Sequence, residues 1–274
     1  MPLWAACSVP ESRGSRDFVD LVPEGTPVRQ QPVDPTGRTA FQVSPIQGKS
    51  VEGRPLTARE LGDEGPCLLL LGAIHGDEPG SHDLLRDFEA WLLAHPIETQ
   101  GLRIVISSPL NPDGLERRTR TNAHGIDLNR NFPSKNFRAS RRRGLEPLCE
   151  PESRFLARLL ETYEPTLVIT VHQPRRSVNW DGPAEDLARA MARQNGYRPE
   201  ATVGYSTPGS LGSWVGIDQG IPILTLELPR KPGPAGSFLE ENLSALILAI
   251  ANVRSGRMSR AGARQASTSP PVSQ

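Results

Sequence analysis

The 274-residue sequence predicts an α/β fold with a mixed, largely parallel sheet and helices on both faces of that sheet. Uninterrupted aliphatic runs, such as 67–74 and 166–171, are typical of strands that are buried on both sides. Segments with apolar residues at helical spacing alternate with these runs, a pattern that favours a parallel sheet covered by helices. Functional side chains in such sheets gather at the carboxyl ends of the strands, so we expect the site there.

The expected elements follow from local patterns along the chain. In order, they are a hairpin at 48–56 around Glu52-Gly53, a strand at 67–74, a helix that carries Leu84, Leu85, Phe88, Trp91 and Leu92 and ends at His95-Pro96, a strand at 102–106, a turn at 111–114, a helix at 152–163, a strand at 166–171, a helix at 183–195, a strand at 221–228 and a helix at 238–253. The helices are predicted from apolar residues three and four positions apart, and the turn is predicted from the sequence Asn-Pro-Asp-Gly. The polar segment that follows this turn shows neither helical nor strand periodicity. Long loops of this kind in compact domains are usually functional.

The chain is expected to form one catalytic domain, residues 44–254, between two less structured ends. Residues 1–43 are rich in Pro, Arg and Asp and show no sustained helical or strand periodicity, which predicts a poorly structured extension. Residues 255–274 are rich in Ser, Arg, Gly and Pro, a composition typical of a disordered tail.

Composition argues against several classes of partner. Lys and Arg total 31 residues and Asp and Glu also total 31, so no net charge favours nucleic acid or an anionic membrane. No apolar segment approaches the ~20 residues of a transmembrane helix. The three cysteines, Cys7, Cys67 and Cys149, have the spacing of neither a disulfide framework nor a zinc site, which predicts a reducing, cytoplasmic location.

A metal site is predicted directly after the strand at 67–74. His75 and Glu78 are three positions apart, so an imidazole nitrogen and a carboxylate can face one point. Catalytic zinc sites use three protein ligands and keep one position open. Among the five histidines, His172 follows a second aliphatic strand as His75 follows the first, which favours it as the third ligand. His124, in the polar loop, remains the alternative.

Hydrolysis at a metal site also needs a base, and Glu227 is the predicted one. It lies in the apolar run 224–228, where burial of a carboxylate without a partner is costly. A nearby metal site gives a reason for its position. His75, His172 and Glu227 each fall at the carboxyl end of a predicted strand, so we expect them to lie close together.

These residues belong to a longer set of segments that resembles the zinc carboxypeptidase family. The matching segments are His-Gly-Asp-Glu at 75–78, Asn-Pro-Asp-Gly at 111–114, Arg-Thr-Asn at 120–122, Gly-Ile-Asp-Leu-Asn-Arg-Asn-Phe-Pro at 125–133, Val-His at 171–172 and Gly-Tyr-Ser-Thr-Pro-Gly-Ser-Leu-Gly-Ser-Trp at 204–214. The similarity spans roughly residues 43–254. It implies a zinc carboxypeptidase-like α/β/α fold and one Zn²⁺ ion per chain.

The resemblance also implies the roles of the catalytic residues. His75, Glu78 and His172 would be the zinc ligands, and Glu227 would be the general base. Arg120 would polarise the scissile carbonyl group and stabilise its negative charge. The loop before Arg120 is shorter here than in the digestive members of the family.

Four further residues would contact the substrate according to the same resemblance. Asn129 and Arg130 would hold its free carboxylate, a task that suits the planar guanidinium group of arginine. Tyr205 would close over the bound substrate. Gly212 lies fifteen residues before Glu227, where the digestive enzymes place the side chain that selects the terminal residue. A glycine at this position predicts a pocket open enough for a longer polar residue.

Within the family, the resemblance is to murein peptide amidases, which implies hydrolysis of the γ-D-glutamyl-meso-diaminopimelate bond of a small muropeptide during cell-wall recycling. Two other enzyme functions are the alternatives: a broader metallocarboxypeptidase, and a deacylase like succinylglutamate desuccinylase or aspartoacylase. A catalytically inactive module that binds peptide carboxylates is a third. The presence of both Glu78 and Glu227 argues against the inactive module.

Overall fold

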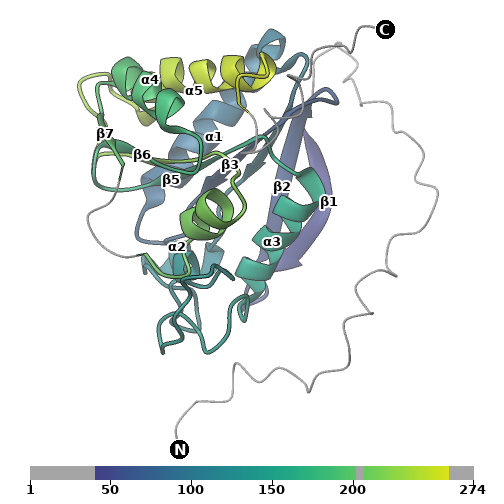
Figure 1. Cartoon of the computed structure of the whole chain (residues 1–274), viewed down its shortest axis with the longest axis vertical. Coiled ribbons are helices and arrows are strands. Elements are labelled where there is room, and N and C mark those ends of the chain that lie inside the picture. Colours follow the sequence, from purple (N-terminus) through teal and green to yellow (C-terminus); the bar gives the residue numbers. More distant parts are fainter. Residues whose placement is uncertain (1–40, 202–206, 259–274) are drawn as a thin grey trace, which may run out of the picture.

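The computed structural model describes residues 41–201 and 207–258 (Figure 1). Within these residues, eight strands form one sheet in the order β1-β2-β4-β3-β5-β8-β6-β7. The strands are β1 (Gln42–Lys49), β2 (Pro55–Gly62), β3 (Cys67–Gly72), β4 (Arg103–Ser107), β5 (Leu167–His172), β6 (Ser177–Asp181), β7 (Arg198–Glu200) and β8 (Ile223–Glu227). The central pairs β4-β3, β3-β5 and β5-β8 are parallel, whereas β1-β2, β2-β4 and β8-β6 are antiparallel. The predicted mixed α/β fold is confirmed.

Helices cover both faces of the sheet, as Figure 1 shows. The helices are α1 (Pro79–Ala94), α2 (Pro112–Arg117), α3 (Pro151–Tyr163), α4 (Glu185–Asn195) and α5 (Phe238–Arg254). Side chains alternate along a strand, so Leu68 and Leu70 of β3 pack in the core with α1, α4 and α5. Leu69 and Leu71 pack in the opposite core with α3. This division explains why no position of the strand carries a polar side chain.

Several elements differ from the sequence-based prediction. The polar loop was expected to follow a turn at 111–114, but Asn111 caps α2 there by accepting a hydrogen bond from the Gly114 amide at 2.8 Å. Asn followed by Pro starts helices as well as turns, which is why the composition misled. The strands β6 and β7 and the π-helix η4 (Gly212–Asp218) were not expected. β6 mixes polar and apolar residues because one of its sides faces a cavity, so it lacks an aliphatic run.

The ends of the domain lie close to the expected boundaries. β1 begins at Gln42, two residues before the predicted start of the catalytic domain, and pairs there with Glu60 of β2. α5 ends at Arg254. Most of the predicted extension and tail lie outside the described residues. No helix in the described part of the chain is long and apolar enough to cross a membrane.

The fully buried carboxylate of Asp113 connects α2 to the turn between β1 and β2. It accepts hydrogen bonds from the Ser50 hydroxyl at 2.8 Å and the Glu52 amide at 3.0 Å, and forms an ion pair with Arg54 at 2.6 Å. Burial alone would raise the pKa of Asp113, but the hydrogen bonds from Arg54 and Ser50 outweigh burial and lower it. Asp113 therefore stabilises the fold in its charged form.

We expect Asp113→Asn to lower the free energy of unfolding by roughly 1–3 kcal/mol at pH 7, because buried donors lose a charged acceptor. The folded-state pKa of Asp113 lies below the unfolded value of about 3.9, so its contribution is complete above that value and is lost as pH falls through the folded-state pKa. Urea denaturation at several pH values measures both effects. The difference between the two proteins should shrink below about pH 4, and a constant difference would exclude the ionic contribution.

Candidate active site

The turn between β3 and α1 positions two of the predicted ligands. His75 lies within it, and Glu78 immediately precedes α1. Gly76 allows the turn to pack directly on α2, because a Cβ atom there would lie 1.9 Å from the carbonyl carbon of Gly114. The Ser81 hydroxyl accepts a hydrogen bond from the Ala73 amide at 2.9 Å and donates one to the Glu78 carbonyl at 2.6 Å. These contacts fix the turn from both ends.

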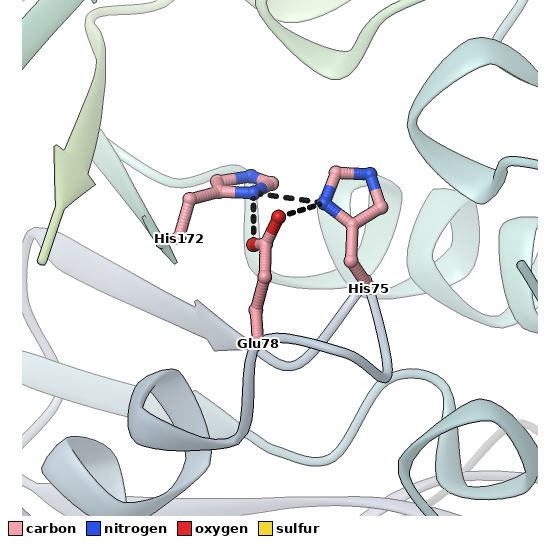
Figure 2. A group of neighbouring side chains, drawn as sticks. All are labelled: His75, Glu78 and His172. Atoms are coloured by element: carbon pink, nitrogen blue, oxygen red, sulfur yellow. Dashed lines mark hydrogen bonds and ion pairs between the residues drawn. The ribbon is translucent and has the colours of Figure 1, made fainter. Parts of the chain in front are cut away.

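The parallel pairing of β3 with β5 brings His172 to the same edge of the sheet. Figure 2 shows the side chains of His75, Glu78 and His172 converging on one point. The Glu78 carboxylate lies 2.9 Å from Nδ1 of His75 and 2.9 Å from Nδ1 of His172, and the two Nδ1 atoms are 3.2 Å apart. All three residues are buried. His124 lies elsewhere, with its Nδ1 atom 2.8 Å from Glu150.

This group has the donors and the geometry that a zinc ion requires. One nitrogen from each histidine and one carboxylate oxygen lie within 4.8 Å of one another. Two imidazoles and one carboxylate make a three-ligand set of the kind found in catalytic zinc sites. Burial alone would raise the pKa of Glu78, but the histidines outweigh burial and lower it, so this carboxylate is ionised and ready to bind a cation. The residues present therefore fit the metal.

Asp127 contacts His75 on the side of the ring that points away from Glu78, a role that the sequence analysis missed. Its Oδ1 atom lies 3.1 Å from Nε2 of His75, the ring nitrogen opposite the one that faces Glu78. A carboxylate in this position fixes the orientation of a metal-binding histidine. Asp127 also accepts a hydrogen bond from Nε of Arg120 at 3.1 Å. Burial would raise the pKa of Asp127, but His75 and Arg120 outweigh burial and lower it. Its position in the polar loop between Arg120 and Asn129 was the available signal.

Glu227 lies at the end of β8, directly opposite His172 in the register of β5 and β8. It is 8% exposed, and its Oε2 atom is one of the few buried side-chain oxygens in the described residues without a hydrogen-bond partner. Burial raises the pKa of Glu227, and the proximity of His172 only partly opposes this. The carboxylate is therefore poised to accept a proton more readily than an exposed glutamate.

One cavity of about 310 Å³ contains most of the predicted site residues. They are His75, Glu78, Arg120, Asn129, Arg130, His172, Gly212 and Glu227. Nη1 of Arg120 lies 3.3 Å from Glu78, and Oδ1 of Asn129 accepts a hydrogen bond from the Leu211 amide at 2.9 Å. Tyr205 lies outside the described residues. The polar loop and the π-helix η4 thus meet over the ends of β5 and β8.

Comparison with known proteins identifies the family. The family model described as zinc carboxypeptidase matches residues 39–188. Murein peptide amidase A of Vibrio campbellii is 34% identical over 234 residues, which cover 77% of this chain and 89% of that protein.

The chain belongs to the zinc carboxypeptidase family.

Further relatives agree with this zinc carboxypeptidase assignment, and the resemblance inferred from the motifs is confirmed. Murein peptide amidase A of Escherichia coli K12 is 32% identical over 209 residues, covering 66% of this chain and 79% of that protein. The crystal structure of murein-tripeptide amidase from Escherichia coli O157 is similar with a TM-score of 0.60 at 26% identity, and the match covers 78% of this chain and 93% of that one. This zinc carboxypeptidase is a hydrolase, as the sequence predicted.

The three-ligand geometry predicts the metal content of variants. The wild-type protein should contain one zinc ion per chain after reconstitution. The His172→Ala variant should contain far less zinc, because one of three protein donors is lost. His124→Ala is the matched control and should retain the metal. Elemental analysis of the purified proteins measures this. Full zinc retention by His172→Ala would exclude His172 as a ligand.

The contact between Asp127 and His75 predicts a smaller effect on the metal. Asp127→Ala should weaken zinc affinity by about 10- to 100-fold, since the histidine loses the partner that orients its ring. Competition with a chelator of known affinity measures this loss, and circular dichroism controls for folding. Unchanged zinc affinity would mean that Asp127 has no part in holding His75.

Proposed function

We propose that this enzyme uses one zinc ion, held by His75, Glu78 and His172, to hydrolyse the amide bond that precedes a free C-terminal residue. The observation that carries this proposal is the position of Glu227. Glu227 lines the cavity that contains the three-donor group, and its buried Oε2 atom has no hydrogen-bond partner in the described residues. An unsatisfied buried carboxylate beside such a group has the properties of a general base.

The chemistry divides between the metal and the side chains of this chain. When bound, zinc would act as a Lewis acid and lower the pKa of a coordinated water towards ~7. Glu227 accepts a proton from the attacking water and later donates it to the leaving amine. Arg120, which lines the same cavity, donates hydrogen bonds to the carbonyl oxygen as negative charge develops there.

The terminal carboxylate of the substrate is held by Asn129 and Arg130. Both line the cavity, and Nη1 of Arg130 donates a hydrogen bond to the Asn129 carbonyl at 2.6 Å, which orients the guanidinium group. A guanidinium group binds a carboxylate through two parallel hydrogen bonds and so fixes its position. This contact places the last amide bond of the substrate, and no other, beside Glu227.

The substrate that we propose is a small muropeptide, cleaved between γ-D-glutamate and meso-diaminopimelate. Support comes from the relatives named murein peptide amidase A. The match with one of them covers 89% of the length of that relative. The cavity also has a mostly polar lining, and Gly212 stands where a large side chain would restrict it. A cytoplasmic location is part of this proposal, because the cysteine content predicts a reducing compartment.

Glu227→Gln tests the proposed mechanism. We expect it to reduce kcat on the order of 10² to 10⁴ while zinc content and thermal stability stay near those of the wild type, because only proton transfer is removed. Glu185→Gln, an exposed glutamate on α4, is the charge-matched control. Near-normal turnover by Glu227→Gln would remove Glu227 from the mechanism.

An assay of L-Ala-γ-D-Glu-meso-diaminopimelate tests the proposed substrate. The zinc-loaded enzyme should release meso-diaminopimelate, and should cleave peptides that end in phenylalanine or arginine at least about tenfold less efficiently in kcat/KM, since the polar cavity pairs poorly with them. Equal or faster cleavage of those peptides would indicate a broader carboxypeptidase. Activity restricted to N-acyl amino acids would indicate the deacylase alternative.

A further inference from the structure

A row of polar side chains leads away from the proposed catalytic centre along β8 and β6. In the antiparallel register of these strands, Ser177 pairs with Glu227, Asn179 with Thr225 and Asp181 with Ile223. Thr225, Asn179 and Asp181 all line the cavity. Asp181 lies at the end of this row, about 13 Å from Glu227 along the strand direction at the usual rise per residue.

The Asp181 carboxylate has no partner of opposite charge among the residues that the structure describes. No ion pair to it is found within residues 41–201 and 207–258, and burial, which raises the pKa of Asp181, acts without any opposing cation. Arg175, a cation that lines the same cavity, is paired with Glu200 at 3.2 Å. Placing a carboxylate in a cavity without a partner is costly, so a ligand that supplies a cation there gains binding energy.

Two glycines of η4 make the space in which this carboxylate lies. A Cβ atom on Gly212 would be 2.1 Å from Oδ2 of Asp181, and one on Gly216 would be 2.5 Å from its Cβ atom. Even an alanine at 212 would therefore displace the Asp181 carboxylate. Gly212 was expected to leave the pocket open enough for a longer polar residue. In the structure, the carboxylate of Asp181 from the neighbouring strand β6 lies beside this glycine.

We propose that Asp181 determines specificity by binding the distal ammonium group of the substrate's terminal residue. This inference rests on the proposed function and deepens it. With the terminal carboxylate at Arg130, the methylene chain of meso-diaminopimelate extends past Thr225 and Asn179, and its distal amino group meets Asp181. A terminal residue of equal length without that amino group leaves the carboxylate unpaired and is rejected.

Two tripeptides that differ only in the distal amino group test this proposal. L-Ala-γ-D-Glu-meso-diaminopimelate is compared with the same peptide ending in 2-aminopimelate, which keeps the chain length and the distal carboxylate. Wild-type enzyme should prefer the first by about 10- to 100-fold in kcat/KM. Asp181→Asn should reduce this ratio to near one. Gly212→Ala should reduce it as well, by displacing the carboxylate, and provides a second variant if Asp181→Asn folds poorly.

The control is Asp186→Asn, which removes the same charge from an exposed position on α4 and should leave the ratio unchanged. Calorimetric binding of free meso-diaminopimelate and free 2-aminopimelate to the zinc-loaded proteins gives a second measurement that does not depend on turnover. If the wild type cleaves neither tripeptide but binds meso-diaminopimelate more tightly through Asp181, the proposed function is wrong and this inference stands. The inference about Asp181 is wrong if Asp181→Asn and Gly212→Ala both keep the wild-type preference for the tripeptide that ends in meso-diaminopimelate.

Discussion

The parallel pairing of β3, β5 and β8 is the constraint on which the rest of the site depends. Because parallel strands end at one edge of a sheet, the residues that follow β3 meet the last residues of β5 and β8. His172 lies opposite Glu227 in this register, and a shift of either strand by one residue would turn its side chain to the other face of the sheet. The aliphatic core on both faces of β3 and β5 opposes such a shift, so packing far from the site maintains the geometry within it.

Four carboxylates in and around the cavity, each buried or partly buried, divide into two kinds. Glu78 and Asp127 contact histidines and an arginine, which lower the pKa of each, and they hold the proposed metal group together. Within the described part of the chain, Glu227 and Asp181 lack a comparable partner, and burial raises the pKa of each. The paired carboxylates therefore stabilise the folded protein in their charged form. The unpaired ones cost stability and are available to a proton or to a substrate cation, which is the usual compromise at functional sites.

The long polar loop and η4 close the cavity over the sheet without contributing aliphatic strands to it. Phe132, in the loop, stacks on Trp214 of η4 with ring centroids 5.6 Å apart. The Gly209 amide donates a hydrogen bond to the Ser134 hydroxyl at 3.1 Å. These contacts order a segment that has almost no regular secondary structure, and they hold Asn129 and Arg130 beside Gly212. Order in such loops comes from specific long-range contacts and not from local propensity.

The sequence by itself determined the elements whose pattern is local. The aliphatic strands that became β3, β5 and β8, the amphipathic helices, and the position of His75 and His172 directly after buried runs could all be predicted, because burial on both faces demands apolar residues at every position. The tertiary structure alone decided which polar residues join them. Asp127 contacts His75 from 52 positions away, and Asp181 enters the cavity because β6 pairs antiparallel with β8 and two glycines of η4 make room. The position of Asp127 in the polar loop was a signal for it but did not name its partner, and Asp181 has no local pattern that marks it, since strand pairing and loop packing depend on contacts between distant segments.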